Sequence, residues 1–284
     1  MLAINFSDTA ELDRQYDIAA AIPEIGAVAH EMKARSAHIR ANCPGYQEHA
    51  YGKGPLQNLD YFPAGPDRPL LVYIHGGYWY AFDKEYFSEI GRAWNRVGVS
   101  VAIVNYRLAP TVRMGEIVDD VRQSVAWLWR NSNKLGFDRS QIVVSGSSAG
   151  GHLTAMMLAT DWVALGPDLP AHLLKGGASI SGLHDLEPFL RAPFLKDTLR
   201  LSEDDVRRYS PARLKPASSA PLITCVGGDE SPAFHAQNAL IAEIWPGVFK
   251  QDIPSPGTNH VTVNMELMNA ETRLFKAIEG LFGQ

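Results

Sequence analysis

The pentapeptide Gly146-Ser147-Ser148-Ala149-Gly150 is the pattern in this sequence with the most direct chemical meaning. A strand-like run, Gln141–Ser145, precedes it, and a run of helical period follows. Glycines two residues to either side of a serine permit a tight turn from strand to helix that leaves the central hydroxyl clear of its neighbours. The setting therefore predicts that Ser148 is a nucleophile. A turn that merely starts a helix is the alternative, and Ser147 lacks the central position.

A second glycine motif follows the apolar run Leu70–Ile74. The sequence His-Gly-Gly-Tyr-Trp places two consecutive glycines, Gly76 and Gly77, just past the end of a predicted strand. Their N–H groups, together with that of Ala149, would form an oxyanion hole for a tetrahedral intermediate. His75 is expected to hold this loop by hydrogen bonds. An ordinary turn from strand to loop is the competing interpretation.

Aromatic side chains follow these glycines and recur later in the chain. Trp79 and Tyr80 come directly after the glycine motif, and Phe189 lies in a segment that is predicted to cover the sheet. We expect the three to line an aromatic substrate pocket. Packing of the loop against the core would explain them equally well.

A serine nucleophile needs a base and an acid that orients the base, because a free hydroxyl attacks poorly at neutral pH. In the hydrolase chain order both partners follow the serine at the ends of later strands. Asp229 is the first carboxylate after the run Leu222–Val226 and is the predicted acid. Asp185 is its rival, and Glu230 is interpreted as a residue that starts a helix.

His260 is the predicted base, because it lies in a loop between the last predicted strand and the terminal helix. The other histidines after Ser148 are interpreted as packing or solvent-facing residues: His152, His172, His184 and His235. No cluster of metal-ligating residues and no phosphate-binding glycine motif occurs at a suitable spacing. The sequence therefore predicts neither a metal nor a cofactor.

The composition of this 284-residue chain excludes several kinds of binding partner. A formal net charge of −5 leaves no basic surface for nucleic acid and no polybasic segment for an anionic membrane, so a small-molecule substrate is expected. A homodimer is compatible with the sequence. Two unrelated cysteines, an acidic N-terminus unlike a signal peptide, and apolar runs too short to span a bilayer predict a cytoplasmic protein.

Short apolar runs alternate with segments of helical period, which predicts an α/β fold with a mostly parallel sheet covered on both faces. The expected parallel strands are Leu70–Ile74, Val99–Tyr106, Ile142–Ser145, Gly177–Ser181, Leu222–Val226 and Phe249–Ile253. Two earlier segments, Gln47–Tyr51 and Gln57–Phe62, are expected to form an antiparallel edge. The expected helices are Lys84–Arg96, Gly115–Leu135, Ala149–Thr160, Pro232–Ile244 and Val261–Phe282.

The chain is interpreted as one domain, 1–284, because no repeat or linker interrupts it. Residues 1–45 are expected to form one or two helices that pack on the carboxyl edge of the sheet. Residues 183–211 fit no strand and are predicted to form a small helical cap over that edge. These two segments are expected to choose the substrate.

These motifs resemble the α/β-hydrolase superfamily, and within it the hormone-sensitive-lipase-like branch, which carries the Tyr-Arg-Leu-Ala-Pro found at 106–110. More narrowly, three stretches look like kynurenine formamidase, also called arylformamidase: 75–79, 146–153 and 181–188. Tyr78 stands where the branch usually has a third glycine, as it does in the formamidase-like group. The resemblance implies the same triad, Ser148, Asp229 and His260.

The resemblance implies hydrolysis of N-formyl-L-kynurenine to formate and kynurenine, and the residues themselves predict acyl transfer to water at a small formamide, amide or ester bond. Two alternatives remain. The same triad would serve a short-chain carboxylesterase or a carbamate hydrolase. A hydrolase fold without activity, acting as a binding module, is the alternative from a different class, and the complete triad argues against it.

Overall fold

The computed structural model describes residues 8–283, so part of the expected N-terminal segment 1–45, residues 1–7, lies outside the described residues. One eight-stranded sheet has the strand order β1-β2-β4-β3-β5-β6-β7-β8. The strands are β1 (Gln47–Ala50), β2 (Asn58–Phe62), β3 (Arg68–Ile74), β4 (Ser100–Val104), β5 (Phe137–Ser147), β6 (Gly176–Ile180), β7 (Leu222–Gly227) and β8 (Phe249–Ser255). β1 and β2 pair antiparallel and β2 joins β4 antiparallel, whereas the pairs from β4 to β8 are parallel. The predicted sheet and its antiparallel edge are confirmed.

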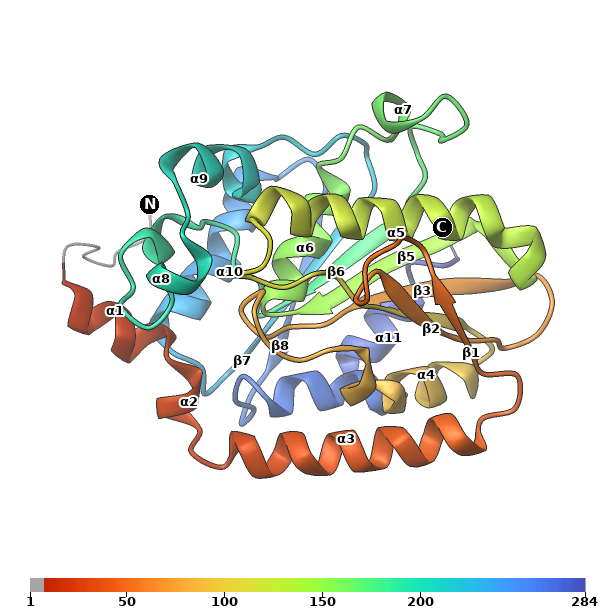
Figure 1. Ribbon diagram of the computed structural model, residues 1–284, viewed down its shortest axis with the longest axis horizontal. Coiled ribbons are helices and arrows are strands. Elements are labelled where there is room, and N and C mark those ends of the chain that lie inside the picture. The colour runs from red at the N-terminus through yellow and green to blue at the C-terminus, as the bar shows by residue number, and fades with distance from the viewer. Residues whose placement is uncertain (1–7, 284) are drawn as a thin grey trace.

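Helices cover both faces of this sheet (Figure 1). The α-helices are α1 (Thr9–Tyr16), α2 (Ile18–Ala21), α3 (Ile25–Asn42), α4 (Ser88–Asn95), α5 (Met114–Leu135), α6 (Ala149–Leu158), α7 (Trp162–Leu165), α8 (Lys196–Leu199), α9 (Glu203–Tyr209), α10 (Pro232–Ile244) and α11 (Arg273–Glu279). The 3-10 helices in the described part of the chain are η1 (Lys84–Tyr86), η2 (Glu187–Leu190), η3 (Pro211–Arg213) and η4 (Thr262–Met268). No helix within residues 8–283 is long and apolar enough to cross a membrane.

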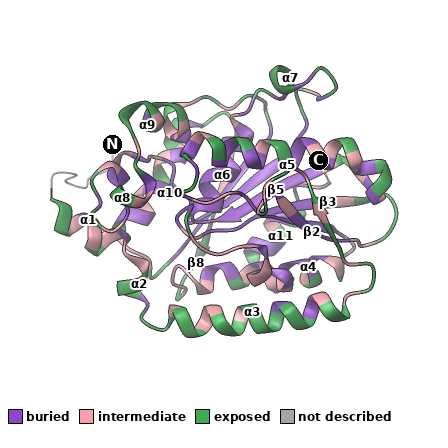
Figure 2. Cartoon of the chain, in the orientation of Figure 1, coloured by how far each residue is buried: buried purple, intermediate pink, exposed green. Residues whose placement is uncertain are grey.

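The alternating side chains of β3 show how the strands divide the core. Leu70, Val72 and Ile74 belong to the cluster beneath α5 and α6, whereas Leu71 and Tyr73 belong to the cluster on the α4 and α11 side. Successive strand residues point to opposite faces, so a strand that is covered on both sides is apolar throughout. Figure 2 shows the result as buried strands between helices whose outer faces are exposed.

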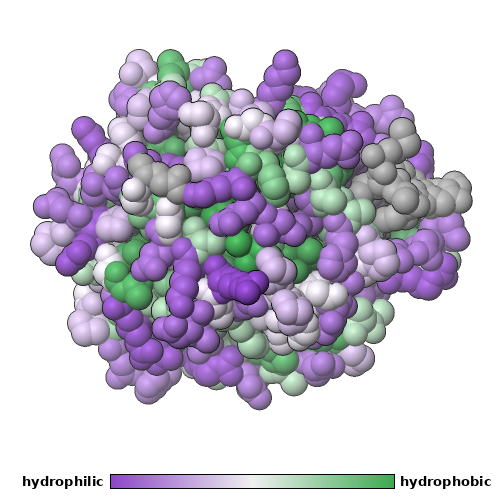
Figure 3. Space-filling model, turned by 180° about the vertical axis from the view of Figure 1, so that it is seen from behind, coloured by the Kyte–Doolittle hydropathy of each residue, from purple (hydrophilic) through white to green (hydrophobic). Residues whose placement is uncertain are grey.

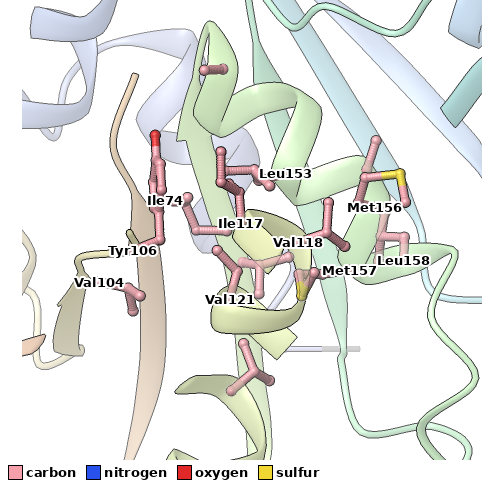
Figure 4. Packing of buried hydrophobic residues seen from close by; sticks show 14 of the residues in the cluster. Ile74, Val104, Tyr106, Ile117, Val118, Val121, Leu153, Met156, Met157 and Leu158 are labelled. Carbon is pink, nitrogen blue, oxygen red and sulfur yellow. The ribbon is translucent and has the colours of Figure 1, made fainter. Parts of the chain in front are cut away.

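The larger cluster packs the apolar stripe of α5 and the apolar α6 against the central strands (Figure 4). The labelled side chains are Ile117, Val118 and Val121 of α5, Leu153, Met156, Met157 and Leu158 of α6, and Ile74, Val104 and Tyr106 from the sheet side. Every one of them is buried. This packing fixes the first turn of α6, where Ser148 lies, against the end of β3.

Two predicted helices are shorter than expected. The expected helix Lys84–Arg96 divides into η1 and α4, and Val261–Phe282 divides into η4 and α11. The second break has a local cause, because the Asn269 side chain accepts from the Glu271 N–H at 3.0 Å and Thr272 caps the next helix by accepting from the Phe275 N–H. Such side-chain bonds compete with a continuous helix.

The N-terminal segment and the segment 183–211 are both helical in the residues that the structure describes. Residues 9–42 form three helices, one more than the upper expectation, and α3 lies against α4 on the outside of the molecule (Figure 1). Residues 183–211 contain η2, α8 and α9, which gather with α1 beside α10. Seen from behind, the surface is mostly hydrophilic, with hydrophobic side chains visible between hydrophilic ones (Figure 3).

Candidate active site

Ser148 lies at the turn between β5 and α6 with a left-handed backbone, φ 58° and ψ −118°. Its N–H donates to the Ile180 carbonyl at 2.8 Å, which fixes the turn to the neighbouring strand. Only 5% of the residue is exposed. A serine in this strained conformation is typical of a nucleophile that a sharp turn presents at the end of a helix.

The flanking glycines are required by close backbone approach. A Cβ on Gly150 would lie 2.0 Å from the Ile74 carbonyl oxygen, and one on Gly146 would lie 2.4 Å from the Gly150 oxygen. Real Cβ contacts are never so short, so neither position accepts a side chain without displacing β3 or α6. The spacing of the glycines around Ser148 therefore reflects the packing of helix on strand.

The glycine pair after β3 lies beside Ser148. Gly76 and Gly77 line the same cavity as Ser148, and a Cβ on Gly76 would lie 3.3 Å from Ser148 Cβ. Gly77 has φ +109°, and its carbonyl accepts from the N–H groups of Tyr80 and Ala81 at 3.1 and 2.9 Å. Ala149 begins α6, whose N-terminus carries the positive end of the helix dipole. The predicted oxyanion residues thus gather around the serine.

His75 is fully buried and orders this loop. Its Nδ1 donates to the Gly76 carbonyl at 2.7 Å, and its ring stacks on Tyr106 at 4.3 Å between centroids. The Tyr106 hydroxyl donates to the His75 carbonyl at 2.9 Å. Burial lowers the pKa of His75 to about 4, only partly opposed by the bond to Gly76, so the imidazole is neutral at pH 7. The predicted loop-holding role of His75 agrees with these contacts.

His260 lies between β8 and η4 and lines the same cavity as Ser148. Its Nδ1 is 2.5 Å from Oε2 of Glu230, and its ring packs against Phe234 with centroids 4.4 Å apart. Because Glu230 occupies Nδ1, Nε2 is the ring nitrogen left for Ser148. An acid at Nδ1 is what fixes the tautomer of a histidine that serves a serine as general base.

The prediction of Asp229 as the orienting acid is wrong. Asp229 is exposed, and its N–H donates to the Thr258 carbonyl at 2.9 Å. The Glu230 N–H donates to the Gly227 carbonyl at 3.0 Å, which closes a turn and brings the Glu230 side chain back over the end of β7. The longer side chain then reaches His260. The rival Asp185 pairs with Arg213 at 3.3 Å.

Three donors hold the Glu230 carboxylate. Oε1 accepts from the Ser181 hydroxyl at 2.5 Å and from the Gly227 N–H at 2.7 Å, and Oε2 faces His260. Burial alone would raise the pKa of Glu230. The electrostatic interaction with His260 and the hydrogen bonds from His260, Ser181 and Gly227 outweigh burial, so the pKa of Glu230 lies below its ordinary value and the acid is ionised at pH 7.

The first helix ties the two loops of the site together. The Tyr78 hydroxyl, beside the glycine pair, donates to the Tyr16 carbonyl at 2.5 Å. The Ser231 hydroxyl, next to Glu230, donates to the Gln15 carbonyl at 2.6 Å, and the Ala233 N–H donates to the Gln15 side chain at 3.1 Å. The end of α1 therefore contacts both the oxyanion loop and the loop of the acid.

A cavity of about 110 Å³ adjoins Ser148. Its walls are Ile18, Ile25, Val28, Ala29, Met32, Gly76, Gly77, Tyr78, Phe82, Phe87, Ser147, Ser148, His260, Val261 and Asn264. The predicted aromatic pocket is wrong in each of its residues. Trp79 and Phe189 are fully buried in the core, and Tyr80 is 42% exposed at the surface. Trp79 instead donates its indole N–H to His152 at 3.2 Å.

Two parts of the site are not predicted from the sequence. Glu230 is adjacent to the predicted acid, Asp229, and no local signal separates the two carboxylates. The apolar wall that α2 and α3 add to the cavity does have a signal in the sequence. Ile25, Val28 and Met32 recur at steps of three and four residues, which marks one apolar face of a helix. That face covers the cavity beside Ser148.

Two further histidines are structural. His152 accepts from Trp79 at Nδ1 and donates from Nε2 to the Tyr209 carbonyl at 2.7 Å. His184 lies 3.0 Å from both the Ser179 hydroxyl and the Gln237 carbonyl. Burial lowers the pKa of His152 to about 3 and that of His184 to about 4. Within residues 8–283, no three His, Cys, Asp or Glu side chains come close enough to hold a metal ion.

The eight-stranded sheet, the strained serine turn and the Glu230–His260 pair define a serine hydrolase of the α/β-hydrolase fold, in the hormone-sensitive-lipase-like branch. A crystal structure from Silicibacter sp. TM1040, described provisionally as a thioesterase, superposes with a TM-score of 0.84 at 30% identity over 95% of this chain and 99% of that one. A family model described as BD-FAE matches residues 61–164.

Proteins of similar sequence identify the family within this class of serine hydrolases. Kynurenine formamidase of Salmo salar is 30% identical over 249 residues, which are 82% of this chain and 81% of that protein. The chain belongs to the kynurenine formamidase family. Esterase LipC of Mycobacterium tuberculosis is 35% identical over a shorter stretch of 133 residues, 44% of this chain and 32% of that protein.

Proposed function

We propose that the chain hydrolyses small formamides of aromatic amines, as N-formylkynurenine formamidases do, through an acyl-enzyme at Ser148. Ser148 Oγ attacks the carbonyl carbon and passes its proton to Nε2 of His260. The N–H groups of Gly76, Gly77 and Ala149 stabilise the oxyanion. His260 then protonates the leaving amine, and a water activated by His260 releases formate from the serine.

The contact of Glu230 with His260 at 2.5 Å is the observation that carries this proposal. An ionised acid at Nδ1 fixes the tautomer that leaves Nε2 as the proton acceptor and stabilises the imidazolium that forms during attack. The triad order is then serine, glutamate and histidine, which is the order of α/β-hydrolases. A binding module without activity would not need an ionised, buried carboxylate on this histidine.

We favour a formamide as the bond that is cleaved, because the similarity to the kynurenine formamidase of Salmo salar covers most of this chain and most of that protein. A short-chain ester is the second candidate, and the similarity to an esterase over 133 residues favours it. Both substrates need the same serine, base and oxyanion groups, so the triad does not distinguish them. A formamidase and an esterase would differ in the leaving group that they bind and in the size of the acyl group that they accept.

Covalent labelling tests the nucleophile. A fluorophosphonate probe should label the folded wild-type chain, and the labelling should disappear in Ser148→Ala. Ser147→Ala is a matched control and should retain the label, because its hydroxyl lacks the central position in the turn. A folded wild type that does not react would contradict the proposal and favour the binding module.

Turnover then separates formamidase from esterase. N-formyl-L-kynurenine, p-nitrophenyl acetate and p-nitrophenyl butyrate are compared on the same enzyme. We expect measurable hydrolysis of the formamide, and this turnover should be lost in Ser148→Ala. Strong ester turnover without formamide turnover would replace the first candidate with the second.

We also propose a cytoplasmic location and a small-molecule partner, with no role for nucleic acid or membrane. Both cysteines are free thiols, and Cys225 is fully buried in β7, where burial raises the pKa of the thiol. Such thiols are compatible with a reducing compartment. Cell fractionation tests the location, and light scattering of the purified chain tests whether it forms the homodimer that the sequence allows.

A further inference from the structure

The cavity beside Ser148 is lined by apolar and neutral polar side chains and by the histidine of the triad. Among the described residues that line it, none is Asp, Glu, Lys or Arg. Apolar residues of α2 and α3 form part of its wall, and Phe82 and Phe87 also line it. A charged group that enters such a cavity loses its hydration shell and gains no ionic partner. The cavity therefore favours substrates whose leaving group is uncharged.

One neutral polar side chain, Asn264, faces this apolar space from η4. Asn264 is 7% exposed and lies one helical turn beyond His260. The hydroxyl of the fully buried Tyr73 donates to its Oδ1 at 3.0 Å. Burial raises the pKa of Tyr73, so this hydroxyl keeps its proton. With Oδ1 engaged, the Nδ2 group of Asn264 is the part of the side chain that remains to donate to a ligand.

A second pocket adjoins the first and shares Met32, Val261 and Asn264 with it. Arg35 and Glu89 line this second pocket, and their side chains pair with each other at 2.9 Å. Arg35 also contacts Glu31 at 3.3 Å. The charges of this pocket are therefore already satisfied within the protein, so a charged ligand group would have to break a pair to bind there.

We propose that the site is specific for uncharged aryl substrates that carry a hydrogen-bond acceptor, and that Asn264 donates to this acceptor. This inference rests on the proposed function and names its substrate class. An aryl formamide or ester with a carbonyl oxygen on the ring substituent fits the cavity. The zwitterionic amino-acid tail of N-formyl-L-kynurenine finds no free counter-charge in the cavity or in the adjoining pocket. Asn264 is the specificity residue, and Tyr73 positions it.

The first test compares substrates on the wild-type enzyme. N-formyl-L-kynurenine and N-(2-acetylphenyl)formamide share the formamide, the ring and the ketone, and only the first has charged groups. We expect kcat/KM for the uncharged compound to be at least equal to that for the amino acid. A kcat/KM more than tenfold higher for N-formyl-L-kynurenine would overturn the proposal. If Arg35→Ala then abolished that preference, the Arg35–Glu89 ion pair of the adjoining pocket would be identified as the binding site of the charged tail.

The second test addresses Asn264 directly. Formanilide lacks the ketone and serves as the reference for N-(2-acetylphenyl)formamide. Asn264→Ala should lower kcat/KM for the ketone substrate about tenfold through KM, the size expected for a neutral hydrogen bond in a dry site, and should leave formanilide within about twofold. Tyr73→Phe should give a smaller loss of the same kind. Asn42→Ala, at the exposed end of α3, is the matched control and should change neither.

An equal loss with both substrates in Asn264→Ala would show a structural role for Asn264 and would overturn the proposal. If the enzyme cleaves esters alone, the formamide proposal fails while this one is still tested, because phenyl acetate and 2-acetylphenyl acetate form the corresponding ester pair. If Ser148 does not react with the fluorophosphonate, the proposed function itself has failed.

Discussion

Two adjacent carboxylates, Asp229 and Glu230, show how side-chain reach selects the acid at the residue scale. Both follow β7, and the sequence places Asp229 first. The Gly227–Glu230 turn directs Asp229 into solvent and returns Glu230 over the strand, where its extra methylene carries the carboxylate to His260. Turn geometry of this kind is not encoded by residue type alone, so the sequence identified the loop but not the residue.

Ser181 is a positioning residue for this acid. It follows β6 with φ 48°, and its hydroxyl donates to Oε1 of Glu230 at 2.5 Å. Ser181→Ala should lower kcat about tenfold with little change in KM, because the carboxylate loses one of its three donors. The loss should also raise the pKa of Glu230 and move the acid limb of the pH–rate profile to higher pH.

Ser179→Ala is the matched control for this prediction. Ser179 lies two residues earlier in β6, and its hydroxyl contacts His184 instead. Its pH–rate profile should follow that of the wild type. Similar profiles for the two variants would show that Ser181 has no specific effect on the acid.

Regular elements at the centre of the sheet were predictable, because a strand that is buried on both faces must be apolar throughout. The bounds of α10 agree with the expected helix residue for residue. The terminal region was less predictable. Helical period continues through Asn269–Thr272, and only side-chain capping bonds divide η4 from α11. Apolar periodicity reports the buried face of a segment and does not report such local breaks.

Asp120 clamps α5 to the loop after β4. It is fully buried and accepts from the Arg107 N–H at 2.9 Å, from the Arg107 guanidinium twice at 2.8 Å and from the Gln57 side chain at 2.7 Å. Asp120→Ala should lower the free energy of unfolding by about 3 kcal/mol, because it leaves the buried Gln57 amide and the partly buried Arg107 guanidinium without their carboxylate partner. Urea unfolding monitored by circular dichroism measures this loss.

The neighbouring Asp119 provides the control for Asp120. Its side chain is 57% exposed and pairs with Arg122 at 2.9 Å. Asp119→Ala should change the free energy of unfolding by less than about 1 kcal/mol, because exposed ion pairs contribute little. Equal effects of the two substitutions would exclude the buried clamp.

At the scale of the whole molecule, the active site is assembled from segments that are far apart in sequence. α1 contacts the oxyanion loop through Tyr78 and the acid loop through Ser231, and α3 supplies apolar side chains that line the cavity. The sequence predicted helices in this region and their apolar positions. The aromatic pocket predicted from the sequence is wrong, because Trp79 packs inward against His152, and residue type alone does not show whether a tryptophan packs inward or lines a cavity.

Three buried histidines should make the fold sensitive to acid. The folded chain keeps His75, His152 and His184 neutral, with pKa values of about 4, 3 and 4, whereas unfolded histidine titrates near about 6.5. Below that pH the unfolded state binds more protons, so the stability present above about pH 6.5 is lost as the pH falls toward the folded pKa values. Each histidine contributes a slope of about 1.4 kcal/mol per pH unit.

Urea unfolding at several pH values between 7.5 and 5 tests this slope. His184→Gln should remove about a third of it, because one of the three titrating groups is lost. His38→Asn should leave the slope unchanged, since His38 is exposed on α3. A wild-type stability that does not change over this range would contradict the burial of neutral histidines.

The most direct test of the triad compares Glu230→Gln with Asp229→Asn. The two substitutions remove one negative charge each from adjacent residues and preserve side-chain shape. On the substrate that the wild type cleaves best, Glu230→Gln should lower kcat by about 10²–10⁴-fold, because His260 loses the acid that fixes its tautomer. Asp229→Asn should stay within about twofold of the wild type. A large loss in Asp229→Asn with normal turnover by Glu230→Gln would contradict the Ser148–His260–Glu230 triad.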